Sequence, residues 1–260
     1  MRSMKRNLIL VLSSVLLLLI WQLASMIIAS PVLLPSLAPV FSSLISLIGQ
    51  PSFAPNVLHT VLRALQSFLI IVASATVVGL VSGRFPLFSL ALKPFVTTLK
   101  AIPVMSVILL AFIWFSSGTV PLFSAFLMGF PVMYVQVEMG YKRLDTHLQE
   151  MCRLYDFPVS ARLTHFIIPS LLPSIVTGAR TALSMVWKVV IASEVLTVPH
   201  YGVGSRMQLA QVQLETEKVL SWTLIAILLT GLGDLLFEGC VLLAVRCKRC
   251  LDARRIPCDL

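Results

Sequence analysis

The sequence contains little charge for its length. Only 12% of its 260 residues are Asp, Glu, Lys or Arg, whereas 58% are hydrophobic. Soluble domains carry about 25% charged and about 45–50% apolar residues, so this balance excludes an ordinary soluble fold. Apolar runs of about 20 residues, the length that crosses a bilayer as a helix, recur along the whole chain. The composition therefore predicts an all-α polytopic membrane protein.

Several motifs of catalysis and cofactor binding are also absent from the sequence. No G-x-x-x-x-G-K-[ST] phosphate loop and no H-E-x-x-H zinc motif occurs, so we expect neither ATP hydrolysis nor a metal site in this chain. Cys247 and Cys250 have the spacing of a metal or redox pair, but no second pair or histidine lies nearby. We expect reduced thiols there, no catalytic residue and no cofactor in this chain.

The basic residues give the chain a formal net charge of +9. They lie in short clusters between apolar runs, which is not the pattern of a nucleic-acid-binding face. The apolar runs predict six membrane spans, at residues 8–29, 60–83, 93–116, 119–141, 170–196 and 219–245. Basic clusters mark alternate connections, so the positive-inside rule predicts that both termini lie in the cytoplasm. The first run is too long for the core of a signal peptide and is expected to stay as a helix.

We expect three parts along the chain. Residues 1–56 hold the first transmembrane helix and an outer linker, residues 57–246 form the transmembrane core, and residues 247–260 form a basic cytoplasmic tail. Five prolines between Pro31 and Pro55 predict an extended conformation for the linker. The third span, 93–116, is the weakest, because its purely apolar part is too short to cross a bilayer alone.

Residues 142–169 form the longest charged connection between predicted spans, and the charge pattern places it in the cytoplasm. Apolar side chains recur at helical spacing in its first half, at Leu144, Leu148, Met151, Leu154 and Tyr155. Charged groups occupy the other faces, so the pattern predicts a short amphipathic helix at the membrane surface. Pro158 is expected to end this helix.

This loop resembles the coupling-loop signature of ATP-binding-cassette (ABC) importer permeases. That signature reads Glu-Ala-Ala, three residues, Gly, about nine residues, and Ile-x-Leu-Pro. The corresponding residues here are Glu150-Met151-Cys152, Asp156 and Phe166-Ile167-Ile168-Pro169, at matching spacing. Asp156 replaces the glycine, and Asp is one of the residues that tolerate a positive φ at a turn.

The resemblance extends from about Leu34 to Val245 and is closest to permeases for sulfonates, taurine, nitrate, bicarbonate or thiamine precursors. Ala192-Ser193-Glu194 and the Gly202-Val203-Gly204 turn are among the segments that carry it. It implies a type I ABC importer permease fold in the cell (inner or plasma) membrane. The implied substrate is a small anionic or heterocyclic nutrient.

The same resemblance implies three partners. A separate cytoplasmic ATPase, which binds ATP and Mg, is expected to dock on the loop. The expected ATPase-coupling residues are Glu150, Met151, Cys152, Arg153, Asp156 and Pro169. A second permease copy, identical or related, should complete the path. An extracytoplasmic substrate-binding protein should dock on the outer connections, especially residues 197–218.

Among the charged residues within the predicted spans, we single out Arg63, Arg180, Lys188 and Glu194. Such charges are costly in lipid and usually face a protein interior or an aqueous path. They indicate either a translocation path or structural pairing, and both interpretations stay open. Arg180 and Glu194 share a helix face but lie about 21 Å apart along it, so any partner must come from another element. A secondary transporter or channel is the alternative function, since it also needs intramembrane charges but no coupling loop.

Overall fold

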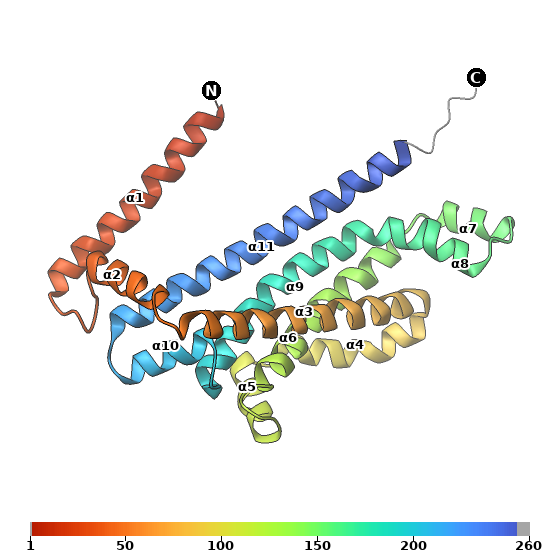
Figure 1. Ribbon diagram of the computed structural model, residues 1–260. Coiled ribbons are helices and arrows are strands. Elements are labelled where there is room, and N and C mark those ends of the chain that lie inside the picture. Colours follow the sequence, from red (N-terminus) through yellow and green to blue (C-terminus); the bar gives the residue numbers. More distant parts are fainter. Residues whose placement is uncertain (1, 254–260) are drawn as a thin grey trace. The chain divides into compact units, whose positions relative to one another are not determined.

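The computed structural model describes residues 2–253 of the chain, except the side chains of residues 2–8, 10, 11, 14, 153 and 245–253. Every regular element in the described part is helical, which confirms the all-α prediction. The helices (Figure 1) are α1 (Arg2–Ile28), α2 (Leu37–Ile48), α3 (Phe53–Arg84), α4 (Pro86–Ala101), α5 (Val104–Trp114), α6 (Val120–Lys142), α7 (Thr146–Leu154), α8 (Val159–Arg162), α9 (Ile168–Thr197), α10 (Val203–Val212) and α11 (Thr216–Ala253), with a π-helical turn, η1 (Leu163–Ile167), before α9. The side chains of Cys247 and Cys250 lie outside the described residues.

The chain forms two compact units. The first combines the chain up to Thr60 with Glu194–Ile227, and the second combines Val61–Ser193 with α11 from Leu228 onward. The loop that carries α7 and α8 belongs to the second unit. The turn between α9 and α10 belongs to the first unit.

Four helical runs are long and apolar enough to cross a membrane. They are α3, α6, the run Val159–Thr197 and the part Thr216–Ala244 of α11. These runs coincide with the second, fourth, fifth and sixth predicted spans. The apolar part of α1 whose side chains are described, Val15–Ile28, is shorter. The total of six spans therefore stays a prediction, as does the placement of the termini.

The third predicted span, 93–116, is not one continuous helix. The helices α4 and α5 meet there at an angle of 100°. Ile102 at the break is extended, with φ −68° and ψ 129°, because the ring of the following Pro103 disfavours helical backbone at the preceding residue. The third predicted span, the weakest of the six in the sequence, therefore corresponds to a bent pair of helices.

The proline-rich segment before α3 is not wholly extended either, because it contains α2. Ser36 precedes the helix in an extended conformation, and Pro39 lies in the first turn, where a missing N–H costs little. Trp21 of α1 donates from Nε1 to the carbonyl of Pro35 at 3.1 Å. The prolines therefore flank or begin helices here, and the prediction of an extended linker is corrected.

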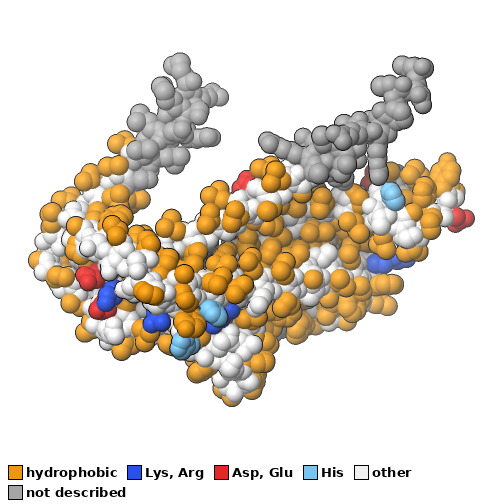
Figure 2. All heavy atoms as spheres, in the orientation of Figure 1, with side chains coloured by type: hydrophobic (Ala, Val, Ile, Leu, Met, Phe, Trp, Pro, Cys, Tyr) orange, Lys and Arg blue, Asp and Glu red, His pale blue; other side chains and the backbone are white. Residues whose placement is uncertain are grey.

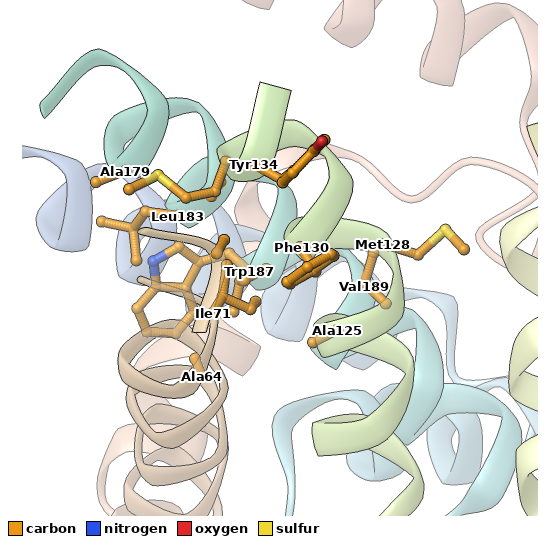
Figure 3. Packing of buried hydrophobic residues seen from close by; sticks show 14 of the residues in the cluster. Ala64, Ile71, Ala125, Met128, Phe130, Tyr134, Ala179, Leu183, Trp187 and Val189 are labelled. Carbon is orange, nitrogen blue, oxygen red and sulfur yellow. The ribbon is translucent and has the colours of Figure 1, made fainter. Parts of the chain in front are cut away.

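The core of the second unit lies where α3, α6 and α9 pack. Ile71, Met133 and Val186 are fully buried in this cluster, and Figure 3 shows Ile71, Phe130 and Trp187 converging from the three helices. A Cβ at Gly129 would lie 2.7 Å from Cδ1 of Ile71, so a larger residue there would displace the end of the Ile71 side chain between α6 and α3. Small residues at such contacts are typical of helix packing in membranes.

Hydrophobic side chains cover most of the long helices on the outside as well (Figure 2). Leu228, Leu235 and Ile113 are examples of exposed apolar residues. An exposed apolar surface of this extent is unfavourable in water but suits contact with lipid chains.

Candidate functional site

The loop between α6 and α9 begins with an ordered turn. Asp145 precedes α7, and its Oδ1 accepts the backbone N–H of His147 at 2.8 Å. This contact satisfies one of the free N–H groups at the start of the helix, the usual task of an N-cap residue. Leu144, next to it, is buried against Ile167 and Leu171. Leu144 thus fixes the loop to α9 and is not part of the exposed stripe of α7.

The end of α7 makes a left-handed turn at Asp156, the position where the coupling signature has glycine. Asp156 adopts a φ of 48°, in the left-handed region. The N–H of Phe157 then reaches the carbonyl of Cys152 at 3.1 Å, which is the closing hydrogen bond of a Schellman motif. Asp156 therefore makes the left-handed turn although it has a side chain.

The face of α7 that the turn leaves open is apolar and exposed. Leu154 is 81% exposed and Tyr155 is 70% exposed, while Cys152 is buried. His147, Glu150, Met151 and Leu154 line a shallow, open hollow on this surface. The side chain of Arg153 lies outside the described residues. An exposed apolar face with a charged neighbour is the form that a helix takes when a partner's groove receives it.

The return from the loop into the membrane runs through η1. Pro169 is half-buried and lies in the first turn of α9, directly after the π-helical turn. A proline ring clashes with the carbonyl four residues earlier in a regular α-helix. The wider π-helical turn accommodates this ring and keeps the chain helical from Val159 to Thr197.

Arg180, one of the predicted intramembrane charges, has an acidic partner from another helix. Its Nη2 lies 3.1 Å from Oε2 of Glu238 on α11. One turn further along, the hydroxyl of Ser184 donates to Asp234 at 3.1 Å. The prediction that a partner must come from elsewhere is confirmed. We had not singled out Glu238 or Asp234, although two acidic residues within the last apolar run were a usable signal.

The other predicted charges have different surroundings. Lys188 is exposed on α9, and Arg63 is half-buried on α3. Glu194 is fully buried at 0% exposure, and it lies in the first unit. A buried carboxylate needs hydrogen bonds or an opposite charge to offset its desolvation.

Backbone and side-chain groups of the first unit supply those hydrogen bonds to Glu194. The hydroxyl of Thr60 lies 2.8 Å from Glu194 Oε2, and the N–H of Gly204 donates to the same oxygen at 3.1 Å. Thr60 also accepts the N–H of Val203 at 2.9 Å. The start of α3, the end of α9 and the start of α10 are thereby joined at one carboxylate.

A second acceptor extends this network. Asn56 Oδ1 accepts the N–H of Gly202 at 3.0 Å and Nε of Arg206 at 3.2 Å. Val198, in the turn that leads to Gly202, has a φ of 43°. Left-handed backbone costs a β-branched residue about 1–2 kcal/mol. The network around Glu194 therefore holds a strained turn between α9 and α10.

Residues 75–241, more than half of the chain, match the sequence profile of the "binding-protein-dependent transport system inner membrane component" family. The chain belongs to this family. A putative ABC transporter permease protein of Methanocaldococcus jannaschii is 27% identical over 71% of each chain. The putative aliphatic sulfonates transport permease protein of Bacillus subtilis is 25% identical, covering 83% of this chain and 78% of the relative. The taurine transport system permease protein of Escherichia coli is 26% identical over 80% and 78%.

The family match and the helices together confirm the main predictions. The chain is a permease subunit of an ABC importer, in the branch that contains the sulfonate and taurine permeases. It is a multi-pass protein of the plasma membrane. The secondary transporter or channel, which the sequence alone left open, has no support among these relatives. Members of this family are transport components that work with an ATPase and a substrate-binding protein.

Proposed function

We propose that the loop between α6 and α9 is where this permease receives the movement of its ATPase. The exposed apolar face of α7 carries this proposal. Leu154 and Tyr155 are open to solvent although the rest of the loop is well ordered by Asp145, Leu144 and the left-handed turn at Asp156. An ordered helix with an apolar face transmits a displacement of the ATPase better than a flexible loop, because little of the movement is lost in ordering its side chains.

Leu154→Asp tests the proposed docking face. Burying a leucine in a partner's groove contributes about 1.5–3 kcal/mol, so we expect at least about tenfold weaker association with the co-expressed ATPase. Val212→Asp is the matched control, because Val212 is also a highly exposed aliphatic residue, at 72%, but lies at the end of α10. Co-purification of the ATPase with each variant is the measurement. Equal recovery with Leu154→Asp and with the control would contradict the docking face.

ATP and Mg are bound by the partner in this proposal, and the permease chain contributes no catalytic residue. The support is the family itself, together with the absence of a phosphate loop from the sequence. The purified permease alone should show no ATPase activity above a mock preparation. Activity should appear only when the partner is added, and hydrolysis by the permease alone would overturn this assignment.

The proposed substrate is a small sulfonate-type anion. The named functions of the Bacillus subtilis and Escherichia coli relatives support it, as do basic residues along the spans. Arg180 is already paired with Glu238, so Lys188, which is exposed on α9, is the better candidate for the path. Uptake of labelled taurine into proteoliposomes that hold the complete transporter tests the proposal. Uptake of an uncharged nutrient in place of taurine would contradict it.

The proposed assembly contains a second permease copy, identical or related, and a substrate-binding protein on the connection 197–218. The network at Glu194 supports this docking position, because it orders the turn between α9 and α10. Crosslinking of the complete transporter through a photoreactive group at Leu214, an exposed residue of this connection, should capture the binding protein. Crosslinks to the ATPase at this position would contradict the proposed orientation.

A further inference from the structure

A basic cavity lies between α4 and α6, away from the charges that the sequence pattern singled out. Its volume is about 460 Å³, which is in the range of small-molecule sites in proteins. Its walls are formed by Pro86, Ser89, Leu90, Lys93, Val96, Thr97, Lys100, Tyr134, Val135, Glu138 and Lys142. Three of these are lysines and one is acidic, so the cavity carries a net positive charge.

The single acidic group of the cavity is already neutralised. Lys142 Nζ lies 2.5 Å from Oε1 of Glu138, four residues before it on α6. Ser89 of α4 donates its hydroxyl to the same carboxylate oxygen, and it accepts a hydrogen bond from Lys142 at 3.2 Å. These contacts join α4 to α6 and leave the other two lysines as the uncompensated charges.

Lys93 and Lys100 lie on one face of α4 with Ser89 and Thr97, because these four positions follow one another at intervals of three or four residues, about one helical turn each. Neither ammonium group has an ion-pair or hydrogen-bond partner among the described side chains. Lys100 lies about 16 Å beyond Ser89 along the helix axis, at about 1.5 Å per residue. The two charges thus stand at successive positions along the cavity, beginning at the end of α6 that leads into the α7 loop.

Both lysines are exposed on α4, which together with α5 is long and apolar enough to cross a membrane as a bent pair. Lysines in such apolar segments are rare and usually mark a path or a ligand. We propose that this cavity binds an oxyanion, either the phosphate of an anionic phospholipid headgroup or the anionic group of a free solute. The ligand's negative charge offsets the two lysines, and their ammonium groups can donate charge-assisted hydrogen bonds to its oxygens. If the ligand is a solute, the site is a section of the anion path and rests on the proposed function. If the ligand is a lipid, the site is independent of the proposed function.

The test uses the purified full-length chain in detergent and two probes. Labelled inorganic sulfate is measured by scintillation proximity. Dioctanoyl phosphatidylglycerol is counted by native mass spectrometry against dioctanoyl phosphatidylcholine. Lys93→Gln combined with Lys100→Gln should weaken binding of the anionic probe about 30-fold, on the order of tenfold or less per lysine. Lys93→Arg with Lys100→Arg should restore binding and shows that the fold tolerates changes at both positions.

Arg84→Gln with Arg143→Gln is the matched control, because it removes two exposed positive charges that do not line the cavity. Sulfate binding that phosphatidylglycerol does not displace assigns the site to a solute. Phosphatidylglycerol binding without sulfate binding assigns it to lipid, and mutual displacement shows that both occupy it. The proposal is overturned if neither probe binds. It is also overturned if the chain with Lys93→Gln and Lys100→Gln binds the anionic probe as tightly as the control with Arg84→Gln and Arg143→Gln. No ATPase is present, so failure here leaves the proposed coupling and transport untouched.

Discussion

Replacing Gly202 with alanine tests the buried network of the first unit directly. The backbone at Gly202 is extended, with φ 165°, so an alanine has no conformational penalty there. The obstacle is space, since a Cβ would lie 2.7 Å from Cδ and 2.8 Å from Oε2 of Glu194. The carboxylate cannot move aside freely, because the hydroxyl of Thr60 and the N–H of Gly204 hold it.

The expected cost has two parts. Overpacking in a closed site costs about 1–3 kcal/mol, and losing a hydrogen bond to a charged acceptor costs about 1.5–3 kcal/mol. Together they predict a loss of about 2.5–6 kcal/mol, which lowers the unfolding midpoint of a chain of this size by about 5–24 °C. Thermal unfolding of the purified chain in one detergent is the assay.

Gly231→Ala is the control for this prediction. Gly231 lies within α11, and nothing lies within 4 Å of the Cβ that the substitution adds. Alanine is the better helix former by about 1 kcal/mol, so this variant should unfold at the same temperature as the unmodified chain or slightly above it. An unfolding midpoint of Gly202→Ala as high as that of the control would refute the steric reasoning.

Three further predictions concern single contacts. Asp156→Val should destabilise the α7 turn by about 1–2 kcal/mol, because a β-branched residue disfavours a φ of 48°, whereas glycine at this position should not. Less ATPase should therefore co-purify with Asp156→Val than with Asp156→Gly. Thr60→Val removes a buried hydroxyl that contacts both Glu194 and Val203, so the free energy of unfolding should fall by about 2–3 kcal/mol. Thr97→Val is the control, because Thr97 is exposed and its replacement should change thermal stability little. Arg180→Ala should cost less than about 1 kcal/mol in the same thermal assay, because both partners of its ion pair are about half exposed; a larger loss would indicate a buried role.

The sequence by itself determined the class of protein and most of its spans. Hydrocarbon excludes unpaired backbone, so long apolar runs must form helices whatever their neighbours are. This is why α3, α6, α9 and α11 appear where the apolar runs predict them. The α7 turn was also accessible from sequence, because it depends on local hydrogen bonds between Cys152, Asp156 and Phe157.

Other features depended on residues that are distant in the sequence. The apolar pattern continues across Ile102 and Pro103, so the pattern did not reveal the 100° bend between α4 and α5. The sequence showed that Arg180 needs a partner, but only the packing of α9 against α11 selected Glu238.

The buried carboxylate of Glu194 is the clearest case of what only the tertiary structure decided. Its hydrogen-bond partners come from α3 and from the start of α10, so no spacing in the sequence connects them. The same holds for the cavity between α4 and α6. Lys93 and Lys100 come from α4, and the Glu138–Lys142 ion pair on the opposite wall comes from α6. Local preferences and hydrophobicity fix which segments become helices, whereas the partners of a charge depend on which helix faces come together.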